Sequence, residues 1–207
     1  VSQGMDKLRL HLENGSQHRS QAFLEATQRN AATLALDAKG AIIEKATGTK
    51  PPYIQGFPFP GVTADDAQAA IKILWNTYAD VWNNGSFHNS VQIHWVSTKG
   101  AERSATQEVY YLYYQGQPRQ YIPANNPDDL LVQFLATTVD PADLNGTAAL
   151  NWRYRDSDKR DSVWAYVPAL RRVRAVSPAN RSDGFLGSDM REDDGPFFAG
   201  NLADFNW

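Results

Sequence analysis

Apolar and polar residues alternate with a period of two through much of the chain after Gly85. Val91, Ile93 and Trp95 alternate with polar neighbours, which is typical of a strand that buries one face. Further strand-like runs follow, separated by turn residues, at 108–115, 130–138, 148–155, 162–167 and 172–176. Strands joined by short turns pair antiparallel, because parallel pairs need long crossovers. The pattern therefore predicts a β-meander.

One amphipathic helix is predicted before these strands, over residues 63–83. Apolar residues recur there at helical spacing from Ala67 to Trp82, and Thr63 is suited to cap the N-terminus. Asn83-Asn84-Gly85 is typical of a helix end. A helix of this kind needs an apolar surface to pack on, and the predicted sheet supplies one.

The remaining segments are predicted to be short or irregular. Residues 1–30 are polar and are interpreted as a peripheral segment, and the apolar runs 31–37 and 41–45 indicate a hairpin. The stretch 48–61 contains four prolines, which favours an ordered loop, and 177–207 is rich in Gly, Asp and Phe and resembles a loop. We expect residues 1–207 to form a single domain.

Composition narrows the class of protein. The chain has 207 residues, of which 42% are hydrophobic and 21% charged, and its net charge of −3 gives no electrostatic signature of nucleic-acid binding. It contains no cysteine, which excludes disulfides, thiolate metal sites and a cysteine nucleophile. No apolar run reaches the roughly 18 residues that span a bilayer. Residues 1–5 lack the pattern of a signal peptide, so we expect any secretion signal to have been removed.

No catalytic or metal-binding motif is present in the sequence. His88 and His94 would lie roughly 20 Å apart on a strand, too far to share one zinc ion. The acidic residues Asp189, Glu192 and Asp193 lack the spacing of a calcium loop. We therefore expect no metal, no cofactor and no enzymatic activity. Paired carboxylates for glycan hydrolysis leave no local signature, so a glycan-acting enzyme stays an alternative.

Aromatic residues make up 12% of the chain, and many fall on successive predicted strands. They could line a ligand cavity or form an ordinary core. Arg172 and Arg174 point to the same side of their predicted strand. They could bind an acidic headgroup, form a docking site, or pair with aspartates such as Asp183, Asp189 and Asp193.

Two stretches of the chain resemble a known bacterial family. The first is Gly56-Phe57-Pro58-Phe59-Pro60, followed by Ile73-Leu74-Trp75-Asn76. The second is Val163-Trp164-Ala165-Tyr166-Val167-Pro168, followed by Arg171-Arg172-Val173-Arg174 and Ser182-Asp183-Gly184. Both are similar to motifs of a family of uncharacterised secreted proteins that resemble outer-membrane lipoprotein-sorting (Lol-type) carriers.

The resemblance implies a mainly β (α+β) fold, in which a curved antiparallel sheet or half-open β-barrel wraps one or more helices. It also implies a periplasmic carrier for a hydrophobic, lipid-like ligand, with a membrane exporter or outer-membrane protein as partner. The alternative is a non-catalytic structural or docking subunit of an envelope complex. The ligand-binding residues expected on this basis are Trp75, Trp95, Tyr111, Tyr113, Trp152, Tyr154, Trp164, Tyr166, Arg172 and Arg174.

Members of the resembling family are longer than this chain. We therefore expect a fragment that lacks C-terminal strands. Its last strand would then leave an open sheet edge, which a second copy could cover in a homodimer.

Overall fold

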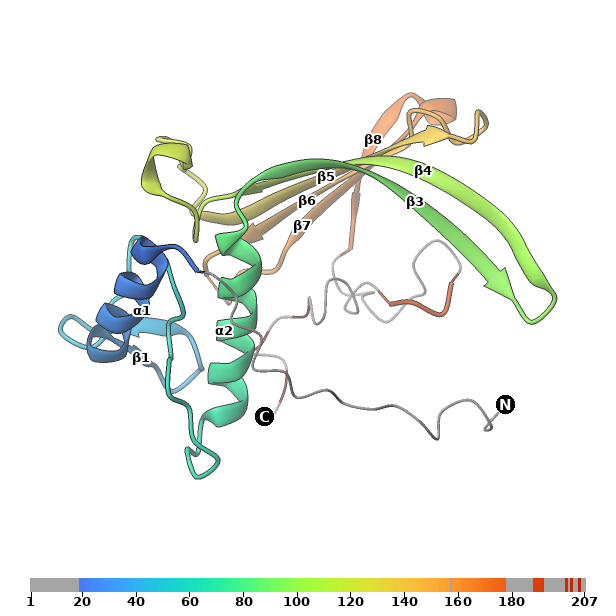
Figure 1. Ribbon diagram of the computed structural model, residues 1–207. Coiled ribbons are helices and arrows are strands. Elements are labelled where there is room, and N and C mark those ends of the chain that lie inside the picture. The colour runs from blue at the N-terminus through green and yellow to red at the C-terminus, as the bar shows by residue number, and fades with distance from the viewer. Residues whose placement is uncertain are drawn as a thin grey trace.

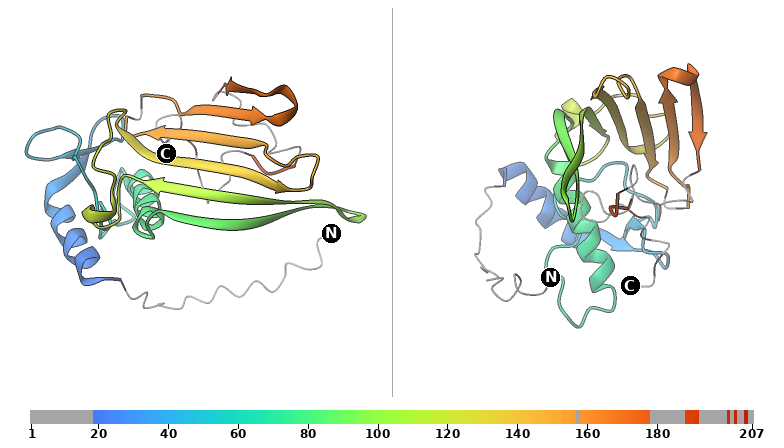
Figure 2. Two further views of the ribbon diagram at one scale, coloured as in Figure 1. Left: turned by 90° about the horizontal axis from the view of Figure 1, so that it is seen from above. Right: turned by 90° about the vertical axis from the view of Figure 1, so that its right-hand side faces the viewer.

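A six-stranded antiparallel sheet is the main element of the computed structural model, which describes residues 19–156, 158–177, 188–191, 200, 202 and 205. Its strands are β3 (Phe87–Ser97), β4 (Gly100–Tyr113), β5 (Leu130–Asp140), β6 (Ala148–Tyr154), β7 (Ser162–Val167) and β8 (Arg172–Val176). Strands adjacent in sequence are adjacent in the sheet, as the left view of Figure 2 shows. The predicted meander is confirmed.

The sheet is strongly curved and arches over the helix α2 (Ala69–Asn83) without closing into a barrel (Figure 1). The strand pairing shifts register between Trp95 and Val96, between Thr106 and Gln107, and between Leu130 and Val132. Such bulges bend a strand and increase its twist, which accounts for much of the curvature. The predicted mainly β, half-open architecture is confirmed.

Helix α2 begins six residues later than predicted. Thr63 does not cap it: residues 63–68 form turns, in which the Thr63 carbonyl accepts from the Asp66 backbone N–H at 3.2 Å. The Asp66 carboxylate accepts from the Gln68 backbone at 2.8 Å and from Lys72 at 2.6 Å. Asp66 therefore stabilises the turn that leads into the helix, whose N-cap residue Gln68 makes no side-chain capping bond. The predicted end at Asn83 is confirmed.

The N-terminal part of the described chain contains α1 (Gln21–Thr33), β1 (Leu34–Leu36) and β2 (Ile42–Glu44). Helix α1 packs through Phe23, whose ring meets that of Phe57 edge-on at 4.9 Å between centroids. The β1–β2 hairpin is confirmed, although its first strand starts three residues later than predicted because the alanine-rich segment before Leu34 continues the helix. Residues 1–18 of the predicted peripheral segment lie outside the described residues.

Two buried clusters hold these parts together. Leu34, Ile42, Ile54 and Phe59 form one cluster between the hairpin, the proline-rich loop and Trp75 of α2. The second cluster joins α2 to the sheet and consists of Ala79, Trp82 and Tyr113. The loop is ordered, as predicted: the Asn30 side chain donates to the carbonyls of Gln55 and Phe57 at 2.8 and 3.1 Å, and the Asn76 side chain donates to the Phe59 carbonyl at 2.8 Å.

Strands β3 and β4 extend beyond the rest of the sheet as a two-stranded ribbon (Figures 1 and 2). Pairing of β4 with β5 begins only at Thr106, so residues 93–105 form a two-stranded ribbon with no third strand beside it. The predicted buried face of this strand was wrong: Val91 is 39% exposed, and Ile93 and Trp95 are only partly buried. The start of β4 carried no strand pattern in the sequence: Arg103 and Ser104 are exposed, and Ala105 is the first buried side chain described on this strand.

Candidate functional site

A cavity of about 700 Å³ lies between the concave face of the sheet, α2 and the β1–β2 hairpin. Its walls come from segments far apart in the sequence, from Ile42 and Ile54 through Trp75 to Val163 and Leu202. Most of the residues around it are apolar. A volume of about 300–1,000 Å³ with a largely apolar lining and a few polar groups is typical of a small-molecule site.

The sheet leaves room for this cavity because small side chains form a row across its concave face. Ala136 of β5 is paired with Ala149 of β6, which in turn is paired with Ala165 of β7. Residues opposite each other in antiparallel strands point to the same face, and all three alanines line the cavity. Larger side chains at these positions would fill the space under the arch.

Aromatic rings form the wall beside α2. Trp75, Tyr78 and Trp82 lie on one face of the helix, with Trp75 5.8 Å from Tyr78 and 6.1 Å from Trp82 between ring centroids. The Trp75 indole N–H donates to the Gly40 carbonyl at 2.8 Å, which ties the helix to the β1–β2 hairpin. Across the cavity, the rings of Tyr111 and Phe134 approach to 4.6 Å.

One largely buried ion pair is part of the mainly apolar wall. Arg153 of β6 donates from Nε and Nη2 to the carboxylate of Asp161, with the shortest contact 2.9 Å from Nη2 to Oδ2. The Asp161 side chain is 11% exposed and that of Arg153 is 23% exposed. A bidentate pair of this kind holds both groups in a fixed orientation. It places a polar contact point inside the cavity.

Burial raises the pKa of Tyr111 and of Tyr113, and the nearby charge of Arg153 partly opposes this. The folded state thus favours the neutral phenols, so stability from these groups is present below pH about 10 and is lost as pH rises through their folded-state pKa values.

In a spectrophotometric titration we expect the double variant Tyr111→Phe, Tyr113→Phe to lack the last-ionising tyrosines. The control Tyr121→Phe, at a 64% exposed side chain, should leave these late-ionising tyrosines in the titration curve. Identical late titration in wild type and double variant would contradict this.

The rim of the cavity is formed by two charged segments that meet there. Lys39, in the turn between β1 and β2, and Lys50, after β2, form ion pairs with Asp158 at 2.6 Å and Asp156 at 3.1 Å. Arg155 donates to the carbonyls of Pro51 and Pro52. These contacts bind the β6–β7 turn to the N-terminal part of the chain beside the opening.

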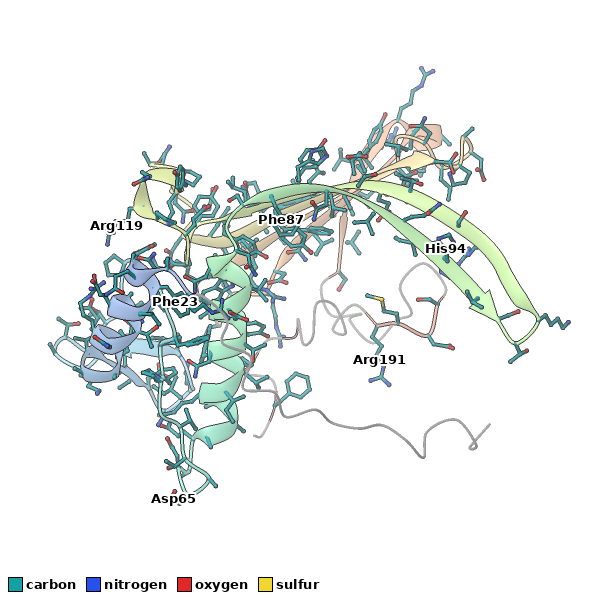
Figure 3. All side chains as sticks on the ribbon, viewed as in Figure 1. Phe23, Asp65, Phe87, His94, Arg119 and Arg191 are labelled. Carbon is teal, nitrogen blue, oxygen red and sulfur yellow. The ribbon has the colours of Figure 1, made fainter. Side chains whose placement is uncertain are left out.

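Four of the ten predicted ligand-binding residues line the cavity: Trp75, Tyr111, Tyr113 and Tyr154. The other four aromatics lie elsewhere, and the structure places them as follows. Trp95 lies on the ribbon, stacked under the Arg103 guanidinium at 4.3 Å, and Figure 3 shows the adjacent His94 far along that ribbon from Phe87. Trp152, Trp164 and Tyr166 alternate with the cavity-lining residues of β6 and β7 and thus face the convex side.

Arg172 and Arg174 lie on the edge strand β8, where all five residues are exposed. By register they share the face of Val167 and Ala165, but they do not line the cavity. Two of their predicted partners, Asp183 and Asp193, lie outside the described residues. A ligand-binding role for the ten predicted residues stays a prediction.

Sequence reasoning missed several wall residues, among them Phe134, Ala149, Asn151, Arg153 and Asp161. The predicted meander contained a signal that could have found some of them, because residues paired across neighbouring strands point to the same face of the sheet. Tyr111 faces the cavity, and it is followed across the sheet by Phe134, Asn151 and Val163. To identify this row, the register of each strand pair must be known, and the register cannot be read from the sequence alone.

Within the described ranges, no group of three His, Asp or Glu side chains is arranged to hold a metal ion. Across the same residues, no helix has the length and apolar character needed to cross a membrane.

The family model described as "Protein of unknown function (DUF1329)" matches residues 7–207. The chain belongs to this family. The resemblance of its proline-rich loop and its Trp-x-Tyr and Arg-Arg-Val-Arg segments to a family of uncharacterised proteins is thereby confirmed. No curated protein matches the chain.

Two solved structures are similar to the chain. One is a domain from Vibrio parahaemolyticus provisionally described as an outer membrane lipoprotein-sorting protein; it shares 19% identity over 61% of this chain, with a TM-score of 0.43. The other is a DUF1329 family protein from Desulfovibrio piger, with 22% identity over 62% of this chain and a TM-score of 0.43. The matched part amounts to 48% of each of these two chains, so this chain spans about half their length.

Proposed function

We propose that this chain is a binding or carrier protein for a hydrophobic, lipid-like ligand, which occupies the cavity under the curved sheet. The observation that carries the proposal is the cavity itself, about 700 Å³ in volume and walled mainly by apolar side chains from α2 and β4–β7. Transfer of apolar ligand surface from water into such a site is favourable in proportion to the area removed from water. We propose binding rather than catalysis as the role of this site.

The geometry suits an amphiphile better than a purely apolar molecule. The wall beside α2 is aromatic, whereas the opposite side holds the Arg153–Asp161 pair and the rim carries further charges. A ligand with an apolar tail and a polar end matches both parts. The proposed compartment is the periplasm, and the proposed recipient is a membrane exporter or outer-membrane protein, because the secreted proteins that the motifs resemble act there.

A docking subunit is the second candidate, and the edge strand β8 is the observation that favours it. In the described part of the chain β8 pairs only with β7, and its side chains are exposed. An open edge of this kind can add a strand from a partner or from a second copy of the chain. A cavity that takes up no ligand, together with a stable dimer in light scattering, would favour this candidate over the carrier.

Filling the cavity should abolish ligand uptake. Ala149 lines the cavity on β6 yet is itself exposed, so Ala149→Trp should place an indole in the ligand space without disrupting packed core. In native mass spectrometry with organic extraction, we expect the wild type to carry or take up a lipid and Ala149→Trp to lose it.

The matched control is Ala175→Trp, at an exposed position of β8 that does not line the cavity. It should retain the wild-type ligand, and both variants should keep the wild-type unfolding midpoint to within a few degrees. Equal uptake by wild type and Ala149→Trp would remove the cavity as the binding site. An empty wild type that also excludes hydrophobic probes would refute the carrier proposal.

A further inference from the structure

We propose that the ligand is an anionic amphiphile, whose negatively charged head is held at the rim of the cavity by Lys39, Lys50, Arg155 and Lys159. This rests on the proposed function and adds the chemical class of the ligand. The head could be a fatty-acid carboxylate or a lipid phosphate, because both present oxygen acceptors with negative charge.

Charge around the cavity is the first observation that supports this. Among the described charged residues that line it, six are cationic and two are acidic: Lys39, Lys50, Arg153, Arg155, Lys159 and Arg191 against Asp156 and Asp161. Two further acidic side chains outside the lining, Asp158 and Asp129, pair with Lys39 and Arg155, which still leaves the cations in excess. The whole chain carries a net charge of −3, so the positive rim is a local accumulation and not a reflection of overall composition. Cations gathered around a low-dielectric opening attract and orient anions. In Figure 3, Arg191 lies beneath the arch of the sheet, on its open side.

The position of the cations relative to the apolar wall is the second observation. Lys39 and Lys50 approach the β6–β7 turn from the N-terminal part of the chain, while Arg155 and Lys159 belong to that turn. The side chains of Lys39 and Lys50 are 64% and 37% exposed, so they lie at the solvent boundary. Inward from them are Arg153 and Asp161, already paired with each other, and then the aromatic wall. An anionic head at the rim therefore leaves the tail pointing into the apolar space.

The present partners of the rim lysines can be exchanged for a ligand. Lys39 is paired with Asp158, whose side chain is 59% exposed, and Lys50 with Asp156, which is 50% exposed. Exposed ion pairs contribute little to stability. A carboxylate or phosphate that arrives with its tail already bound can thus take over these lysines while the aspartates turn to water.

Competition between matched ligands tests the inference on the full chain. A neutral naphthylamine fluorophore would be displaced by palmitate and by hexadecanol, which have the same tail but differ in charge. We expect palmitate to bind about tenfold more tightly at low ionic strength, with the difference shrinking as salt is raised. Lysophosphatidylglycerol, which is anionic, and lysophosphatidylcholine, which is zwitterionic, show which anionic head the site binds. If lysophosphatidylglycerol binds tightly and palmitate does not, the head is a lipid phosphate. If palmitate binds tightly and lysophosphatidylglycerol does not, the head is a fatty-acid carboxylate.

The double variant Lys39→Ala, Lys50→Ala should lose the preference for the charged ligand and keep hexadecanol affinity, which also shows that it is folded. The control Lys45→Ala, Lys99→Ala removes the same charge from positions that do not line this cavity and should keep the preference. Equal affinity for palmitate and hexadecanol, or a preference that survives loss of Lys39 and Lys50, overturns the inference while the proposed function stands. If no amphiphile displaces the fluorophore, both the proposed carrier function and the inference of an anionic ligand are refuted.

Discussion

Replacement of Gly116 by alanine is expected to destabilise the fold by about 3 kcal/mol, through backbone strain and overpacking together. Gly116 has a φ of +81°, and a Cβ atom added there would lie 2.5 Å from the backbone carbon of Trp82 and 2.5 Å from its Cβ. Its N–H donates to the Ile54 carbonyl at 2.8 Å. The end of β4, the end of α2 and the proline-rich loop therefore meet at this residue, and none of them can move away independently.

Gly48 provides the matched control for this prediction. It has a similar φ of +69°, but an added Cβ would meet no atom within 4 Å. Gly48→Ala should therefore report the cost of the left-handed conformation alone, about 1 kcal/mol. The two variants are compared by urea unfolding. If both lose the same stability, close packing of Gly116 against Trp82 is not what fixes glycine at that position.

The second large effect is expected at the ion pair inside the cavity. Asp161→Ala should cost about 2–3 kcal/mol, because it leaves the largely buried guanidinium of Arg153 without its carboxylate. This expected loss of stability is smaller than the loss for a completely buried ion pair, since 23% of the Arg153 side chain is exposed. Chemical unfolding of the variant at neutral pH measures the loss.

Removing both charges separates pairing from packing. The double variant Arg153→Met, Asp161→Leu replaces the pair by apolar groups of similar volume, which is often neutral for stability. We expect it to recover most of what Asp161→Ala loses, to within about 1 kcal/mol of wild type. A single variant that is as stable as wild type, or a double variant less stable than the single, would show that the two side chains do not depend on each other.

Much of the fold could be predicted from the sequence because its signals are local. Strands β7 and β8 were predicted with the bounds that the structure has, since dense apolar runs there are closed by Asp161, Pro168 and Ser177. The outer part of β4 was not predicted, because residues 101–105 pair only with β3 and the sequence there does not alternate between apolar and polar residues. Capping by Thr63 failed because residues 63–68 form turns, one of them closed by the Asp66 carboxylate on the Gln68 backbone N–H, and the helix begins only at Ala69.

The cavity wall could be predicted only in part, because alternation shows that a strand has two faces and not which face is concave. On β6 Trp152 was expected to bind ligand, whereas its neighbour Arg153 lines the cavity and Trp152 does not. Trp152 packs instead against the cluster that contains Tyr114 and Leu130. The bulges at Thr106 and Leu130 set the phase of each strand, and they depend on contacts between strands.

The strictly sequential order of β3 to β8 has a consequence for how the chain folds. Each strand pairs with its neighbour in the sequence, so the sheet closes only short loops, which is the fast kind of contact to make. The N-terminal part attaches to the sheet through bonds that span 61 to 119 residues, such as Ile54 to Gln115 and Lys39 to Asp158. We expect the arch to form first and the N-terminal part to dock on it afterwards. The cavity would then be the last feature of the molecule to be completed, and a ligand that fills it would stabilise that final docking step.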